Sequence, residues 1–330
     1  MRSRSLTGFL LAFVCLSAAL ALPARADSLQ PALVPVNSAL QAGQADKALS
    51  LISLLPQQGL NNAQALNLAC RVRFTLGQWD TAVRHCEEAV RLDPNNARNH
   101  MWLGRAYGEK ANKASFLSAF SLGKKVVQEF QKAAQLDPQD AEALADLGSF
   151  YAEAPSIVGG GVEKAQTVAA QLDHIDPARA YELRAQIDKQ RKDFTSAEND
   201  LKKAISVSHH PAFQWTTLAR FYMARKRWDD MDAAIRSVMT AAAREAHSGV
   251  ALYDAAGVLI MAKRDPALAA KLLQEYLSGS SKTEEAPAFV AYSRLALLQQ
   301  ELGDAANAQV SQAAALQMAR DYQPAQDSRR

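Results

Sequence analysis

Three segments of the chain repeat one arrangement of large, apolar and small positions. Residues 100–107, 144–151 and 215–222 each begin with a large side chain, followed by Leu at the fourth position, a small residue at the fifth and Tyr at the eighth. Positions one, four, five and eight lie on the same face of an α-helix. The pattern therefore predicts three amphipathic helices with equivalent packing faces.

A second pattern consists of three small or apolar residues, spaced by four and then by three positions. It occurs before or between the helices of the first pattern. Its members are Ala82, Cys86 and Ala89, then Val126, Phe130 and Ala133, then Ala197, Leu201 and Ala204. Three segments then end in Asp-Pro, at Pro94, Pro138 and Pro177. Because proline has no amide hydrogen and clashes with the preceding turn, it ends a helix. The chain is thus predicted to consist of consecutive helical hairpins.

These two patterns resemble the tetratricopeptide repeat, whose first helix has W-x2-L-G-x2-Y and whose second has A-x3-F before a proline. Weaker copies extend the register from residue 43 to residue 315. The resemblance implies an all-α fold, a right-handed α-solenoid of about eight helical hairpins over residues 27–320, with a polar C-terminal tail at 321–330. Residues 109–120 and 153–161 also resemble a group of exported bacterial tetratricopeptide proteins of unassigned role.

Two of the hairpins are longer than the others at the same edge. The distance from small residue to closing proline is 24 residues from Cys70, 34 from Gly104 and 29 from Gly148. The longer insert contains Phe116 and Phe120, four residues apart. We expect both helices to extend and to pack these aromatic rings together, and a projecting apolar knob is the alternative.

The shorter insert contains three consecutive glycines, Gly159, Gly160 and Gly161. A phosphate-binding loop would follow a strand and end in Gly-Lys-Ser/Thr, whereas here the glycines follow a predicted helix and precede Val162 and Glu163. Glycine also permits a tight chain reversal. We interpret this segment as a connector between two helices, with small-ligand or phosphate binding as the weaker alternative.

The N-terminal pattern predicts export. Residues 1–26 combine Arg2 and Arg4 with an apolar run and an Ala-Arg-Ala ending, which is typical of a cleaved signal peptide. Cleavage removes three of the 37 basic side chains and leaves 34, equal to the 34 acidic ones. A neutral chain gives no general reason to expect nucleic acid as a partner. We therefore expect a periplasmic protein without an integral membrane segment after cleavage.

The mature chain would keep two cysteines, Cys70 and Cys86, on the facing helices of one hairpin. Their expected offset of about one helical turn favours two buried thiols, and a disulfide is the alternative in an oxidising compartment. No His-x3-His motif, Cys-x2-Cys pair or Gly-x-Ser-x-Gly elbow occurs in the sequence. We predict no catalytic residues, no metal site and no cofactor.

In the tetratricopeptide family, residues beside the helix seam of the first helices line the concave groove. The corresponding positions here are Arg71, Arg105, Ser149, Gln186 and Arg220. Guanidinium groups would suit an acidic partner or a chain terminus, although Glu109, Glu142 and Glu182 lie on the same helices and would pair with them equally well. The sequence thus predicts a non-catalytic scaffold that binds a protein or peptide. The alternative is a regulatory or substrate-holding subunit of an envelope enzyme or secretion machine.

Overall fold

The computed structural model describes residues 29–245 and 248–327, so the predicted signal peptide lies outside the described residues. Within these ranges the chain forms eight helical hairpins, which confirms the predicted all-α solenoid. The paired helices are α1 (Gln30–Gln41) and α2 (Ala45–Ser53), α4 (Ala63–Thr75) and α5 (Trp79–Leu92), α6 (Ala97–Lys113) and α7 (Phe116–Leu136), α8 (Ala141–Glu153) and α9 (Val162–Leu172), α10 (Pro177–Gln190) and α11 (Phe194–Val207), α12 (Pro211–Ala224) and α13 (Trp228–Ala242), α14 (Gly249–Ala262) and α15 (Pro266–Ser278), and α16 (Ala288–Glu301) and α17 (Ala305–Met318). Three short helices complete the fold: α3 (Gln57–Leu60), the 3-10 turn η1 (Ser156–Val158) and α18 (Gln323–Asp327).

The small residue of the first pattern permits close approach between helices. A Cβ atom added to Gly104 would lie 2.5 Å from the ring of Phe130, and one added to Gly148 would lie 2.4 Å from Leu183. Both distances are far below ordinary van der Waals contact. The spacing read from the sequence is therefore a packing requirement of the hairpins.

The tyrosine of the first pattern joins each hairpin to the one before it. The Tyr107 hydroxyl donates to Glu87 Oε1 (2.6 Å), that of Tyr151 accepts from Gln131 Nε2 (2.8 Å), and that of Tyr222 donates to Glu198 (3.0 Å). Burial and the Glu198 carboxylate raise the pKa of Tyr222 to about 12. The repeated tyrosine thus stabilises the stacking of successive repeats.

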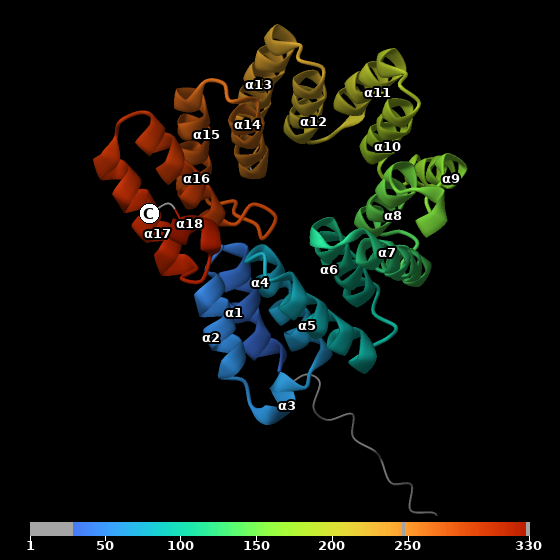
Figure 1. Cartoon of the computed structure of the whole chain (residues 1–330), viewed down its shortest axis with the longest axis vertical. Helices are drawn as coiled ribbons and strands as arrows, with labels where there is room; N and C mark the ends of the chain where they lie inside the picture. Colours follow the sequence, from blue (N-terminus) through green and yellow to red (C-terminus); the bar gives the residue numbers. More distant parts are fainter. Residues whose placement is uncertain (1–28, 246–247, 328–330) are drawn as a thin grey trace, which may run out of the picture.

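The array closes on itself. In Figure 1 the hairpins follow a closed curve, so that the C-terminal helices lie beside the N-terminal ones. Helix α17 packs beside α2, and the Arg320 amide donates to Asp46 Oδ2 across the junction (2.9 Å). One core cluster of buried side chains includes both Leu40 of α1 and Phe289 of α16. The repeat pattern predicted a solenoid, and the structure adds that this solenoid is a ring.

A buried ion pair lies at this junction. Arg71 on α4 is 4% exposed, and its guanidinium donates through Nε and Nη2 to both carboxylate oxygens of Glu284, which is 8% exposed. Glu284 belongs to the loop of residues 279–287 between α15 and α16, and its amide donates to the Gln41 side chain (3.3 Å). At the same junction, Gly43 lies close against the backbone of Ala288. The two ends of the chain are therefore joined by specific polar and steric contacts.

The C-terminal segment is part of the ring, which corrects the expected polar tail. The Tyr322 ring packs edge-on against Phe289, with ring centroids 4.9 Å apart. Ala325 of α18 is fully buried. The packed array therefore extends past residue 320 to α18.

Cys70 and Cys86 form a disulfide, which corrects the interpretation of two free thiols. Their Cα atoms are 5.3 Å apart, within the range that a disulfide requires. The two cysteines face each other at the same level of the α4–α5 hairpin, so the offset expected from the sequence is absent.

Removing one partner of the closing ion pair should open the ring. Glu284→Ala leaves the Arg71 charge buried without a counter-charge, so we expect a loss of about 3 kcal/mol in the free energy of unfolding. Small-angle scattering should show an increased radius of gyration. Glu275→Ala is the control because that side chain is exposed on α15, and it should change both quantities little. Unchanged scattering and stability in Glu284→Ala would exclude a closing role for the pair.

Candidate functional site

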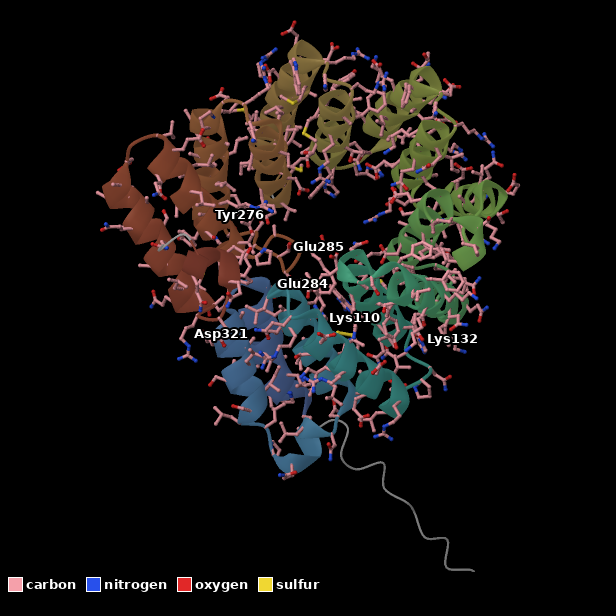
Figure 2. All side chains as sticks on the ribbon, viewed as in Figure 1. Lys110, Lys132, Tyr276, Glu284, Glu285 and Asp321 are labelled. Atoms are coloured by element: carbon pink, nitrogen blue, oxygen red, sulfur yellow. A yellow bond between two sulfur atoms is a disulfide. The ribbon has the colours of Figure 1, made fainter. Side chains whose placement is uncertain are left out.

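The first helices of the hairpins line the centre of the ring, and the second helices form its outer side (Figure 1). A hollow of about 950 Å³ opens between α4, α6 and α8 on one side and the 279–287 loop on the other. Figure 2 shows Glu284 and Glu285 on this loop, near the centre of the ring. We call this space the inner hollow. The wall formed by the 279–287 loop is present because the two ends of the array meet.

Aromatic side chains from α4, α5 and α6 form one wall of the inner hollow. Phe74 packs edge-on against Trp79 and Trp102, with ring centroids 5.2 and 5.5 Å apart. Phe74 and Trp79 remain partly exposed, whereas Trp102 is 4% exposed. The indole Nε1 of Trp102 has no hydrogen-bond partner among the described residues. This wall therefore offers the partly exposed faces of Phe74 and Trp79, and beneath them lies one buried donor without a partner among the described residues.

The cation at this wall is already neutralised. Arg105 Nε donates to Asp146 Oδ2 (2.6 Å), and its Nη2 lies 2.7 Å from Glu142 Oε1. Its guanidinium also lies 4.9 Å from the Trp102 ring centroid. Burial alone would lower the pKa of Arg105, but the two carboxylates outweigh burial and raise it. Arg105 is thus fixed within the protein as a paired cation.

Three carboxylates of the inner hollow have no cationic partner. Glu109, Glu153 and Glu285 line the hollow, and no ion pair or hydrogen bond from their side chains occurs among the described residues. Burial raises the pKa of Glu285, and repulsion by Glu142 and Glu284 adds to this, whereas attraction by Arg105 and Arg179 opposes it. The other guanidinium that lines the hollow, Arg294, lies 4.7 Å from the Tyr253 ring centroid. The hollow therefore contains three carboxylates and one guanidinium, that of Arg294, without an ion pair among the described residues, which leaves an excess of negative charge.

The predicted row of groove residues is placed differently from the expectation. Arg71 is buried in the junction of the ring, where it pairs with Glu284, and it lines a smaller hollow beside α1 in place of the inner hollow. Arg105 and Ser149 line the inner hollow, and Arg220 pairs with Asp254 of the next first helix (2.9 Å). Gln186 is half-buried, and its Oε1 has no partner among the described residues. Because the three arginines are paired internally, the row offers no free cations for an acidic partner.

Of the carboxylates expected to pair with these arginines, only Glu142 does so. Glu182 instead accepts a hydrogen bond from Thr217 (3.2 Å), which links α10 to α12. Glu109 faces the hollow without a partner among the described residues. The sequence could place these side chains on the inner helices, but their partners lie on neighbouring repeats.

The longer insert confirms the predicted extension of both helices, since α6 and α7 continue to Lys113 and from Phe116. The expected packing of the two aromatic rings is wrong. Phe116 is 86% exposed and Leu117 is 79% exposed, whereas Phe120 is half-buried beneath Lys124 (4.5 Å from Nζ to the ring centroid). The tip of this hairpin is therefore apolar and uncovered.

The glycine segment is a connector between α8 and α9. Gly159 has a φ of 106°, in the left-handed region that favours glycine. Gly160 is needed for space, because an added Cβ would lie 1.8 Å from the Ala154 carbonyl oxygen. All three glycine amides are used inside the turn, as donors to Ser156, Pro155 and Tyr151 carbonyl oxygens. No glycine amide is left to bind a phosphate.

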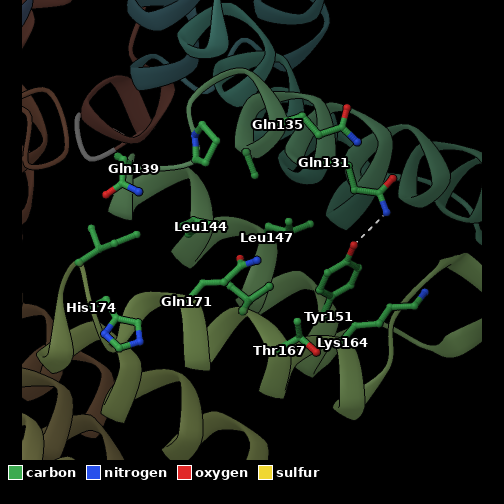
Figure 3. Close-up of a pocket in the computed structure, with 14 residues that line it drawn as sticks. Gln131, Gln135, Gln139, Leu144, Leu147, Tyr151, Lys164, Thr167, Gln171 and His174 are labelled. Atoms are coloured by element: carbon green, nitrogen blue, oxygen red, sulfur yellow. Dashed lines mark hydrogen bonds between the residues drawn. The ribbon is translucent and has the colours of Figure 1, made fainter.

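A second hollow of about 730 Å³ lies between α7, α8 and α9 (Figure 3). Its polar lining is mostly uncharged, with four glutamines, Gln131, Gln135, Gln139 and Gln171. Gln131 is bonded to Tyr151, and Lys164 Nζ donates to the Gly159 carbonyl oxygen (2.9 Å). Two of its side-chain donors, those of Gln131 and Lys164, thus already have partners within the protein.

Two other kinds of site are absent from residues 29–245 and 248–327. These residues contain no group of three or more His, Cys, Asp or Glu side chains that could hold a metal ion. None of the helices described is both long enough and apolar enough to span a bilayer.

Three features identify the fold: the consecutive helical hairpins, the close helix contacts at the small residues, and the tyrosine hydrogen bonds between successive hairpins. The chain folds as a tetratricopeptide-like α-solenoid. No protein-family model matches the sequence, and a comparison with curated proteins finds no match.

Several solved structures resemble parts of the ring. The tetratricopeptide protein TTC0263 of Thermus thermophilus is 17% identical and covers 58% of this chain and 99% of its own, with a TM-score of 0.49. A tetratricopeptide repeat protein from Parabacteroides merdae is 15% identical and covers 83% of this chain and 99% of its own, with a TM-score of 0.48. MamA is 19% identical and covers 55% of this chain and 92% of its own, with a TM-score of 0.41. At these identities the similarity concerns the fold alone.

The glycine connector gives a prediction about stability. Gly160→Ala places a methyl group against the Ala154 carbonyl, so we expect a loss of about 2 kcal/mol in the free energy of unfolding. Gly108→Ala is the control, since no atom lies within 4 Å of its added Cβ. It should be neutral or stabilising by up to about 1 kcal/mol, because alanine favours helix more than glycine does. Saturable phosphate binding that disappears in a Gly160→Ala protein of unchanged stability would refute the connector role.

Proposed function

We propose that this protein is an exported, non-catalytic scaffold that binds a protein or peptide partner in the bacterial envelope, with the inner hollow as the binding site. The observation that carries the proposal is the hollow itself, which combines partly exposed Phe74 and Trp79 with carboxylates that have no partner among the described residues. Partly buried aromatic side chains are enriched at positions that contribute most to protein binding. Helical repeat arrays also present extended inner surfaces to polypeptides.

Two independent features support export. The pattern of residues 1–26 is that of a signal peptide. Cys70 and Cys86 form a disulfide, a bond that persists in oxidising compartments and is rare in the cytosol. The two features concern different parts of the chain and agree on the compartment.

Export predicts the mass of the protein isolated from the periplasm. Cleavage should leave a chain that begins near Asp27, and oxidation of Cys70 and Cys86 should lower its mass by about two hydrogens. Intact-mass spectrometry without reductant measures both changes, and reduction of the same sample is the control. Recovery of a chain with residues 1–26 attached in the inner membrane would contradict export, and two titratable thiols would contradict the disulfide.

Partner binding can be tested by crosslinking inside the cell. A photo-reactive amino acid at Asn112, an exposed residue that lines the inner hollow, should capture a partner. The same amino acid at Lys271, exposed on α15, is the control and should not. The purified partner should lose about tenfold or more in affinity for Trp79→Ala, because truncation of a central tryptophan removes much of the binding energy. Equal capture at both positions, or an unchanged affinity, would contradict the inner hollow as the site.

A further inference from the structure

Around the inner hollow, two arginine side chains form ion pairs, whereas several carboxylates do not. Arg71 is neutralised by Glu284, and Arg105 by Asp146 and Glu142. These pairs use two positive charges of the inner helices, whereas the guanidinium of Arg294 and the carboxylates of Glu109, Glu153 and Glu285 have no ion pair among the described residues, so negative charge is in excess. A partner that enters the hollow would therefore meet unpaired negative charge.

The same hollow contains the aromatic cluster of Phe74, Trp79 and Trp102. Arg71 and Arg105 already lie over the Trp102 ring, so the faces left for a partner are those of the partly exposed Phe74 and Trp79. Aromatic faces attract a lysine ammonium or an arginine guanidinium through the ring quadrupole. Carboxylates form charge-assisted hydrogen bonds with the same groups. Aromatic faces together with unpaired carboxylates thus suit an organic cation, in contrast to the acidic partner that the row of arginines had suggested.

The unpaired Trp102 donor distinguishes between kinds of cation. Trp102 is 4% exposed, and its Nε1–H has no acceptor among the described residues. A buried donor without an acceptor is costly. Because this nitrogen is buried, a ligand removes that cost only where the side chains that cover the nitrogen move aside and the ligand supplies an acceptor. A polypeptide brings backbone carbonyl oxygens with its cationic side chains, whereas a polyamine or a metal ion brings no acceptor.

We infer that the inner hollow binds a basic polypeptide segment, whose lysine or arginine side chain lies between the aromatic cluster and the carboxylates of Glu109, Glu153 and Glu285. This inference rests on the proposed function and adds the chemical class of the partner. It also explains why the 279–287 loop reaches the centre of the ring (Figure 2), since Glu285 completes the set of carboxylates from the opposite wall.

The test compares three labelled peptides of about eight residues that differ only in four positions, occupied by Arg and Lys, by Gln or by Glu. Fluorescence anisotropy with the purified mature protein should show saturable binding of the basic peptide alone. The triple variant Glu109→Gln, Glu153→Gln, Glu285→Gln should bind it about tenfold more weakly, since each lost charge pair contributes a fraction of a kcal/mol to about one. Circular dichroism and thermal unfolding confirm that the variant is folded.

A matched variant controls for net charge. Glu163→Gln, Asp229→Asn and Glu301→Gln neutralise three exposed acids outside the hollow that have no ion pair among the described residues, and this variant should retain affinity within about twofold. Equal loss in both triple variants would show non-specific attraction and overturn the inference. Equal binding of the Gln or Glu peptide, equal competition by spermidine, or no binding of the basic peptide would also overturn it.

The crosslinking experiment separates this inference from the proposed function. If the segment captured at Asn112 lacks lysine and arginine, the protein is a scaffold but the inference about a basic partner is wrong. If nothing is captured at Asn112 and the basic peptide does not bind, both fail.

Discussion

The buried ion pair between Arg71 and Glu284 joins the two ends of the array, and the rest of the structure depends on this closure. A solenoid of eight hairpins normally leaves its terminal repeats facing solvent. Here the pair holds the 279–287 loop against α4, so that the loop forms a wall opposite α6 and α8. Two buried charges are stable only when each satisfies the other. The geometry of the inner hollow therefore depends on a contact outside the repeat pattern.

The repeat unit could be predicted from the sequence because its contacts are local. Gly104 and Phe130 belong to one hairpin, and Tyr107 reaches Glu87 in the hairpin before, so a fixed spacing encodes both. Closure could not be predicted in this way. Arg71 and Glu284 are separated by 213 residues, and Glu284 lies in a loop without the repeat pattern. No periodicity connects such residues, so the sequence predicted the solenoid without its closure into a ring.

The sequence predicted the helices that carry the candidate residues, but not which of these residues line the inner hollow or how they pair. The spacing placed Arg105 and Arg220 on the first helices, and both lie there in the structure. Their partners Asp146 and Asp254 lie 41 and 34 residues further on, at positions that only the angle between successive hairpins brings close. The disulfide was misjudged for a similar reason, since the relative height of Cys70 and Cys86 depends on how α4 and α5 pack. The type of a residue and the helix face on which it lies can be predicted from the sequence of one helix. Its ion-pair or disulfide partner depends on how the neighbouring helix packs.

The disulfide and the closing ion pair act on the same helix. Cys70 and Arg71 are consecutive residues of α4, so the bond to Cys86 fixes α4 against α5 at the point where Arg71 meets Glu284. Both helices also supply the aromatic wall of the inner hollow, through Phe74 and Trp79. A crosslink that restricts the unfolded chain stabilises the packed hairpin. Oxidation therefore stabilises the hairpin that carries the aromatic wall and holds Arg71 toward Glu284, so the shape of the proposed binding site depends on the redox state of Cys70 and Cys86.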